Sequence, residues 1–433
     1  MKPHERNGHM PGGDETLAAV SPDVVGDLVA VERVDVEPSG SQMVPWTPSG
    51  RGGSYDDRTL HEVEVSVVPD IADLVPSVGP GLSRGLDQAT EVITTLDRSH
   101  ADVLTPLATL LLRAESVASS KIENIKADVD EYARALHGVK ENSSAVAMVA
   151  STRALRDLIG TVDDGSDIVM DSILAAHRTL MAADPSERDY AGKARDMQNW
   201  IGGSDYSPLG AMYVPPAPTA VEHHLADLMS FCNRRNVHPI VQASIAHAQF
   251  ESIHPFTDGN GRIGRALVNT ILRRRRVTTA VVVPIASAIV ARRDDYFDAL
   301  AAHRAGDAGP LIAAFTAGSL IAASESSVSA HRLAQMPERW IEDAGRPRAG
   351  SAARKLISGF ATNPVFSADD LEQRFVGATS SMYVAIENLT DAGVIRPLTK
   401  RTRNQVWVVS SIADELDALS VRIASRARTE LRS

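Results

Sequence analysis

Residues 251–265 read ESIHPFTDGNGRIGR, and this stretch lies between two segments that have the periodicity of helices. It brings together a histidine, an aspartate, an asparagine flanked by glycines, and two arginines. A histidine can accept a proton near neutral pH, an aspartate can hold a hard cation, and consecutive backbone amides can face an anion. The combination predicts a site for a ligand that carries phosphate groups.

The turn at 259–261, with Asn260 between Gly259 and Gly261, can adopt backbone conformations that most residues disfavour. Its successive N–H groups can converge on an anion at the start of a helix. That helix is predicted to run over residues 261–276. Two arginines in its first turns, at positions three apart, place guanidinium groups beside this anion nest.

The remaining polar residues of the stretch suit phosphate chemistry. Asp258 precedes the nest and can hold Mg²⁺, which usually takes one or two carboxylates besides the phosphates of a substrate. His254 lies one loop away, where a neutral imidazole can accept the proton of a hydroxyl that attacks phosphorus. Each residue alone has a structural explanation, but no packing requirement asks for the whole set.

The composition of the chain narrows the class of protein. Of 433 residues, 43% are hydrophobic and 23% charged, which is ordinary for a globular protein. The formal charge of −11 argues against a surface that coats nucleic acid or an anionic membrane. A single cysteine, Cys232, excludes an internal disulfide framework. We find neither an apolar run of the roughly 18 residues that a membrane helix needs nor a signal-peptide pattern, so we expect a cytoplasmic protein with no membrane partner.

Hydrophobic periodicity predicts a mainly α-helical body. Helical patterns cover residues 67–137, 145–183, 221–235 and 240–253. Residues 196–218 interrupt this period with aromatic, Gly and Pro residues, which favours a β-hairpin flap. Such a flap can dock a peptide segment through main-chain pairing, although a plain surface hairpin fits the pattern as well.

The two ends of the chain differ from the helical body. Residues 1–58 are rich in Gly, Pro, Ser and acidic residues, which predicts a largely disordered or extended tail, with Trp46 as an anchor. Residues 351–433 follow a Gly/Pro/Arg linker and contain three short helical patterns and a basic segment, IRPLTKRTRNQVWVV. Ser367 is the expected N-cap of the second helix and Gly393 the expected end of the third. This order of elements is typical of a winged helix-turn-helix.

The string HPFTDGNGRIGR closely resembles the signature of the Fic family, HPFx(D/E)GNGRxxR, at every fixed position. The resemblance covers about residues 86–323. It implies a Fic-type helical bundle, with the flap and the winged helix added to it. It also implies the transfer of AMP from ATP to a Ser, Thr or Tyr hydroxyl of a target protein, or of the chain itself.

The resemblance implies a role for each position of the motif. His254 is the expected base, and Asp258 the expected Mg²⁺ ligand. Five residues are expected to bind the phosphates of ATP: Gly259, Asn260, Gly261, Arg262 and Arg265. In that family the second arginine takes the γ-phosphate. Tyr296 is similar to the aromatic residue that lines the adenine pocket, although a tyrosine of the core fits equally well.

A second string, SSKIEN at residues 119–124, resembles the inhibitory helix of the same family, (S/T)xxxE(G/N). Its matching positions are Ser119, Glu123 and Asn124. The resemblance implies that Glu123 pairs with Arg265 and so competes with the γ-phosphate of ATP. We therefore expect an autoinhibited enzyme.

The expected domains are the tail at 1–58, an N-terminal helical segment with the inhibitory helix at 59–145, a catalytic domain at 146–342, and the winged helix with a C-terminal helix at 351–433.

Two other functions stay open: removal of AMP from a modified protein, and nucleotide sensing by a transcriptional regulator that binds DNA. Related proteins also transfer UMP, phosphocholine or phosphate. In proteins that this chain resembles, a winged helix often mediates protein contact or dimerisation, so a homodimer is a further expectation. A net charge of +2 over 351–433, from 11 Lys/Arg against 9 Asp/Glu, does not decide between DNA and protein.

Histidines outside the motif raise the question of a metal site. His223 and His224 are adjacent, and His247 lies four positions before Glu251. Neither pair has a third ligand at a recognisable spacing along the chain. From the sequence we assign no zinc.

Overall fold

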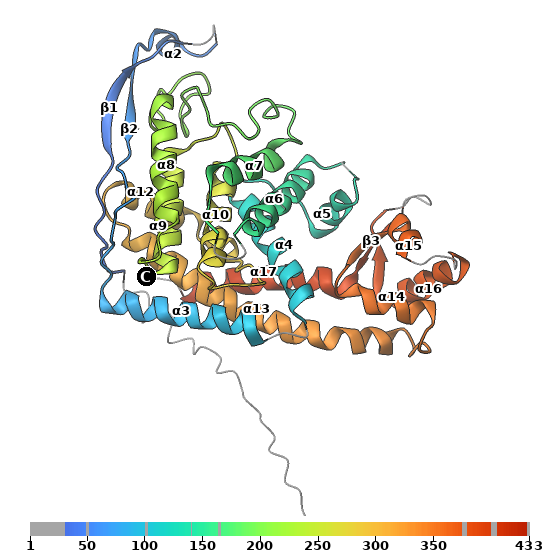
Figure 1. Ribbon diagram of the computed structural model, residues 1–433. Helices are drawn as coiled ribbons and strands as arrows, with labels where there is room; N and C mark the ends of the chain where they lie inside the picture. The colour runs from blue at the N-terminus through green and yellow to red at the C-terminus, as the bar shows by residue number, and fades with distance from the viewer. Residues whose placement is uncertain are drawn as a thin grey trace, which may run out of the picture.

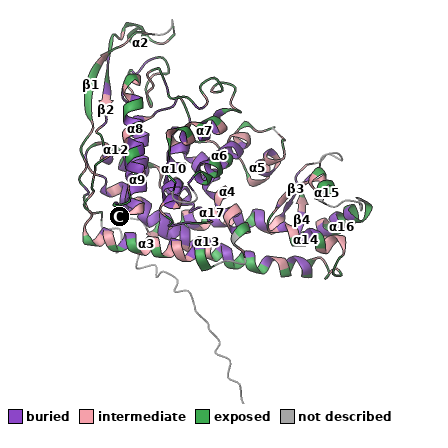
Figure 2. Ribbon diagram, viewed as in Figure 1, coloured by how far each residue is buried: buried purple, intermediate pink, exposed green. Residues whose placement is uncertain are grey.

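The centre of the fold is a pair of helices joined by the motif loop. A computed structural model describes residues 31–48, 52–99, 103–139, 141–162, 166–374, 379–399 and 405–430. Helix α9 (Pro239–Ile253) is buried along its whole length from Ile240, and α10 (Asn260–Arg274) is buried on most positions. Figure 2 shows this buried centre in purple. Because α9 is buried on every side, its polar side chains need partners in the core: Gln242 donates to the carbonyl of Phe231 and Gln249 to that of Pro69.

Other helices surround this pair and confirm the prediction of a mainly helical fold (Figure 1). The helix α4 packs against α6, α11 and α10, while α8 packs against α9. The helices of the body are α3 (Pro80–Ser99), α4 (Leu104–Ile122), α5 (Val129–Leu136), α6 (Ser143–Gly160), α7 (Met170–Met181), α8 (Val221–Cys232), α11 (Ile285–Ala291), α12 (Arg293–Arg304) and α13 (Gly309–Asp343), with a 3-10 turn, η2 (Pro218–Ala220). At the end of α8, Cys232 is fully buried, and burial raises the pKa of its thiol.

The long helix α13 runs from the body to the C-terminal part of the chain (Figure 1). Among the described residues it is the one helix whose length and mean hydropathy would suit a membrane span, contrary to our expectation that no segment would. In the structure 78% of its most apolar window is buried, and α3, α4, α11 and α17 pack against it. A core helix passes the same test of composition, so this helix is accounted for by the core.

The β-hairpin of the body lies where we expected a tail. Strands β1 (Gly40–Pro45) and β2 (Glu62–Val67) pair antiparallel, with Gly40 opposite Val67, and the short helix α2 (Tyr55–Thr59) lies between them. The alternation EVEVSV in β2 buries Val63 and Val65 on one face. Of the predicted disordered or extended tail, β1 has the extended backbone and α2 is helical, while residues 1–30 and 49–51 lie outside the described residues.

The predicted flap at 196–218 is not a hairpin of two strands. Its only β-type pairing among the described residues is one bridge between Ile201 and Tyr213. The Gly and Pro residues that suggested a turn also prevent a longer ladder, because Gly is costly in strands and Pro lacks the N–H donor. The flap is an irregular loop.

The C-terminal unit contains helices α14 (Ala352–Phe360), α15 (Ala368–Arg374), α16 (Thr379–Asp391) and α17 (Ser410–Glu430), and strands β3 (Val365–Ser367), β4 (Ile395–Pro397) and β5 (Val406–Val409). The strands form an antiparallel sheet in the order β3-β5-β4. Ser367 caps α15 by accepting a bond from the N–H of Asp370, and Gly393 has a φ of 71°, as expected for a helix end. The sequence analysis missed β3, which is too short to show alternation. Residues 400–404, the basic tip of the predicted wing, lie outside the described residues.

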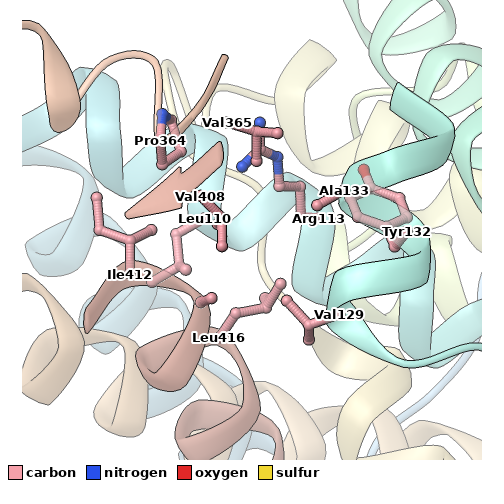
Figure 3. A pocket seen from close by; sticks show the side chains of 11 residues that line it. Leu110, Arg113, Val129, Tyr132, Ala133, Pro364, Val365, Val408, Ile412 and Leu416 are labelled. Carbon is pink, nitrogen blue, oxygen red and sulfur yellow. The ribbon is translucent and has the colours of Figure 1, made fainter. Parts of the chain in front are cut away.

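The C-terminal unit packs on the helices that precede the catalytic segment. Figure 3 shows a small pocket between them, where Leu110 of α4 and Val129 of α5 face Val408 and Ile412. An ion pair between Arg396 and Asp130, with 2.7 Å between Nη2 and Oδ1, crosses the same boundary.

Candidate functional site

The motif loop is set by two residues in the left-handed backbone region. His254 has a φ of 48° and ends α9, while its N–H still donates to the carbonyl of Phe250 at 2.9 Å. Gly259 has a φ of 79° and begins α10. A methyl group at position 259 would lie 2.9 Å from a side-chain carbon of Leu180, so glycine is required there for two reasons.

Side chains inside the loop and behind it hold its shape. Asn260 binds the backbone of Phe256 twice, accepting from its N–H at 2.8 Å and donating to its carbonyl at 2.9 Å. His177 of α7 stacks on the Phe256 ring at 3.7 Å and lies 3.0 Å from the carbonyl of Asp258 through Nε2. The side chain of Asn260 is therefore committed to the loop, and its backbone N–H is the group that can face an anion.

Arg195 is the residue that the sequence analysis missed. Its guanidinium donates to the carbonyls of His254 at 2.8 Å and Pro216 at 2.6 Å, and thus ties the motif loop to the flap. Nearby, Asn199 donates to the carbonyl of Phe256 at 2.9 Å. Burial lowers the pKa of Arg195 to about 10. A lone arginine in a loop without periodicity gives no signal in a single sequence.

The imidazole of His254 is kept neutral by its surroundings. Burial lowers its pKa to about 4, and the nearby cations Arg195 and Arg304 act in the same direction. Its Nδ1 has no hydrogen-bond partner among the described residues. A neutral imidazole with a free ring nitrogen can accept a proton from a hydroxyl group.

Asp258 and Arg262 form an ion pair at the start of α10, with Oδ2 and Nη2 3.2 Å apart. The carboxylate is more than half exposed, whereas the arginine side chain is almost fully buried. Oδ1 of Asp258 also accepts from the N–H of Gly259 at 2.5 Å. An exposed carboxylate beside the first turn of a helix fits the chemistry of Mg²⁺, which prefers oxygen ligands.

Arg265 lies buried between α10 and α4, where three acceptors bind it. Its Nε donates to Oγ of Ser119 at 2.8 Å, and its Nη2 donates to the carbonyl of Ser119 at 2.9 Å and to Oε1 of Glu123 at 2.8 Å. Although burial opposes it, the charge of Arg265 lowers the pKa of Glu123. The contact between Glu123 and Arg265 that we expected is present in the structure.

The end of α4 presents Glu123 to the start of α10. Glu123 is the C-cap of α4, and Asn124 turns the chain with a φ of 60°, a conformation open chiefly to Gly and Asn. A methyl group at position 261 would lie 2.0 Å from Oε1 of Glu123, so the carboxylate lies directly on the first turn of α10. It therefore lies at the predicted anion nest.

Tyr296 lies in the core rather than at an open surface. It is 3% exposed, and its hydroxyl is 2.8 Å from Nε2 of His247. The structure thus favours the alternative of a core tyrosine over that of an adenine-lining residue.

The N-terminal hairpin reaches the flap. Trp46 contacts Trp200 edge to face, with ring centroids 5.6 Å apart, as expected for an anchor. At the tip, Ser207 donates to Oδ1 of Asp57 at 2.6 Å. The N–H of Ser66 donates to the carbonyl of Val214 at 2.9 Å. Whether the flap docks a peptide stays a prediction.

Comparisons with known proteins indicate the same family as the motif. Residues 167–272 match the Fic/DOC family. The chain is 32% identical over 178 residues to protein adenylyltransferase fic-1 of Caenorhabditis briggsae, and 31% identical over 179 residues to that of Caenorhabditis elegans. Each match covers 40% of this chain and 31% of the relative, so the chain spans about a third of the curated relatives it matches.

The fold also matches a solved structure. A Fic family protein from Desulfovibrio desulfuricans G20 superposes with a TM-score of 0.51 at 23% identity, over 77% of this chain and 97% of that one. At this identity the similarity concerns the fold alone.

Proposed function

We propose that this chain, which contains a domain of the Fic/DOC family, transfers AMP from ATP to a hydroxyl side chain of a target protein. The observation that carries the proposal is the convergence of a neutral His254, the backbone amides of the first turn of α10, and two buried arginines of α10 around the motif loop. The relatives named protein adenylyltransferase support the same chemistry.

The mechanism follows from where charge develops. When a hydroxyl attacks the α-phosphorus, the bond to the bridging oxygen breaks and pyrophosphate leaves with growing negative charge. The amides of Asn260 and Gly261, at the start of α10, and the buried guanidinium of Arg262 stabilise that charge. His254 accepts the proton of the attacking hydroxyl. Mg²⁺ held by Asp258 would supply further neutralisation of the phosphates.

We further propose that Glu123 restrains this activity. Its carboxylate uses the guanidinium that would hold the γ-phosphate and lies on the turn where phosphate oxygens would approach the amides. Two anions cannot share this place, because like charges at such distances repel strongly in a partly buried site. Removing the carboxylate takes away one of the three acceptors of Arg265, which stays bound to Ser119, and uncovers the first turn of α10.

The test is the intact mass of variant proteins after incubation with Mg²⁺ and ATP. We expect Glu123→Gly to gain AMP and to modify added protein faster than the wild type, and the double variant with His254→Ala to gain none. Lys121→Gly is the matched control, because it weakens the same helix end without removing the carboxylate. Equal rates for wild type and Glu123→Gly would overturn the restraint. Full transfer by the His254→Ala double variant would overturn the assignment of the base.

A further inference from the structure

Three potential metal ligands meet on one side of α8, far from each other in sequence. Nε2 of His223 lies 3.0 Å from Oδ1 of Asp70, and Nδ1 of His224 lies 3.6 Å from the same oxygen. The three ligand atoms lie within 4.8 Å of one another. The third ligand that the sequence spacing did not supply thus comes from the segment after β2.

The spacing of these atoms suits a tetrahedral ion. Zn²⁺ binds imidazole nitrogen and carboxylate oxygen at about 2.0–2.2 Å, which sets neighbouring tetrahedral ligands about 3.3–3.5 Å apart. The two distances to Asp70 fall on either side of this range. Two histidines and one carboxylate, with a fourth position left to water, form a recurrent ligand set for divalent transition metals.

His224 gives the second, independent observation. It is 8% exposed, and its Nδ1 is buried with no hydrogen-bond partner among the described residues. Its distance to Asp70 is too long for a hydrogen bond. An ordinary ion pair between Asp70 and His223 would leave this nitrogen unsatisfied, at a cost that buried polar groups rarely carry. A bound cation would satisfy it.

The backbone around Asp70 is fixed on both sides before any ion binds. The carbonyl of Pro69 accepts from Gln249 of α9 at 2.7 Å. Asp227 of α8 accepts from the N–H groups of Ile71 at 2.7 Å and Ala72 at 2.9 Å. Side chains from two core helices thus hold the carboxylate opposite the two histidines, and such preorganisation reduces the cost of assembling a metal site.

We propose that Asp70, His223 and His224 bind one Zn²⁺ ion, with water in the fourth position. The ion fastens the segment that leaves β2 to the N-terminal turns of α8. Because β2 belongs to the hairpin that contacts the flap, the ion stabilises the base of that hairpin.

The experiment uses the full chain without a histidine tag. Zn²⁺ is titrated into the protein by calorimetry, and bound metal is counted by mass spectrometry after dialysis. We expect one equivalent in the wild type. In Asp70→Asn and in His223→Ala, both at exposed positions, we expect affinity to fall by at least about tenfold, since even the loss of an outer-shell partner costs that much. Mg²⁺ and Ca²⁺ should not compete, because they prefer all-oxygen sites.

The control is His331→Ala, which removes an exposed histidine of α13. It should bind Zn²⁺ like the wild type. A double variant with His4→Ala and His9→Ala tests whether the histidines near the N-terminus bind the ion instead. It should also bind Zn²⁺ like the wild type. Circular dichroism shows whether each variant is folded. Absence of stoichiometric Zn²⁺ in the wild type, or unchanged affinity in the folded Asp70→Asn and His223→Ala variants, would refute the site.

Discussion

Arg265 is bound mainly by Ser119 and Glu123 of α4. Single substitutions of these two residues should therefore change how firmly the guanidinium is held. Ser119 accepts through both its hydroxyl and its carbonyl, and Glu123 accepts through its carboxylate. The serine therefore holds the arginine in the geometry that the glutamate needs. A serine four positions before a glutamate lies on the same side of α4, so that both residues can bind one guanidinium.

We expect Ser119→Ala to raise AMP transfer above the wild-type level but below that of Glu123→Gly. A hydrogen bond to a charged group contributes about 1.5–3 kcal/mol, so its loss weakens the hold on Arg265 by about tenfold or more. The measurement is the initial rate of AMP transfer from labelled ATP. Ser120→Ala is the matched control, because its hydroxyl bonds only to the carbonyl of Ser116 within α4. Equal rates for the two alanine variants would contradict the role of Ser119.

The pH dependence of transfer should lack a step near the ordinary pKa of histidine. Burial lowers the pKa of His254 to about 4, so its base form persists as the pH falls to 5. The negative charge of Glu123 raises that pKa, so the Glu123→Gly variant retains the base form to a still lower pH. The measurement is kcat/KM of Glu123→Gly across pH 5–8, which reports the free enzyme. A loss of activity centred near pH 6.5, the ordinary range of histidine, would contradict the lowered pKa of His254.

At the scale of elements, α4 and α10 are locked in register by a ladder of polar contacts. Glu115, Ser119 and Glu123 are spaced four apart on one side of α4, and they face Asn269 and Arg265, which are four apart on α10. Oε1 of Glu115 lies 3.5 Å from Nδ2 of Asn269, and its Oε2 accepts from the N–H of Ala286 at 2.9 Å. The contact between Glu123 and Arg265, to which we attribute a restraining role, is thus supported by a whole helix face rather than by one pair.

Glu115 makes this ladder sensitive to pH. Burial raises its pKa to about 8, against the opposing effects of Ala286 and Arg265. The folded protein therefore holds a proton that the unfolded chain releases near pH 4.5, and the stability that this proton gives is lost as the pH rises toward 8.

We expect Glu115→Gln to unfold at a higher temperature than the wild type at pH 8, by about 2 °C or more, and to show a smaller difference at pH 5. The amide keeps an acceptor for Ala286 but needs no proton. Differential scanning calorimetry at the two pH values measures the effect, with Glu91→Gln on the exposed side of α3 as the control. A difference that does not grow with pH would contradict the titration of Glu115.

The sequence predicted these elements unevenly, and the reasons are physical. Helices α8, α9 and α10 were predicted within a few residues because apolar residues recur at helical spacing over a long stretch of each. The strand β1 was missed because Gly, Ser and Pro mask its alternation, although Val63 and Val65 in β2 do alternate. Within the site, the motif gave His254 and its neighbours, but Arg195 acts through backbone carbonyls that no local pattern encodes.

At the scale of the whole molecule, the C-terminal unit is fastened to α5 and to α4, the helix whose end carries Ser119 and Glu123. Arg396 of β4 binds Asp130 of α5, and α17 packs against α4 and α5. Arg134 also donates to the carbonyl of Leu398 at 3.4 Å. A partner that pulls on this unit would act on α4 through these contacts. The same long-range assembly explains why Asp70 and its two histidines could not be recognised from spacing along the chain.

We expect Arg396→Glu to loosen this boundary, because it places a negative charge beside Asp130 and Asp414. An exposed ion pair contributes only about 0–1 kcal/mol, so repulsion should open the contact locally without unfolding the protein. Hydrogen–deuterium exchange should rise in α5 and at the end of α4, with a modest rise in AMP transfer. Arg346→Glu, which changes an exposed pair at the end of α13, should leave α5 unchanged. Unaltered exchange in α5 of Arg396→Glu would contradict the coupling.

The buried position of Cys232 has a practical consequence for following these motions. With its thiol shielded inside the core and held in the unreactive protonated form, the native chain offers maleimide reagents almost no natural target. A cysteine introduced on α5 and another on α16 can therefore carry fluorescent dyes without first removing the natural one. Energy transfer between two such dyes would follow the distance between the C-terminal unit and α5 in single molecules.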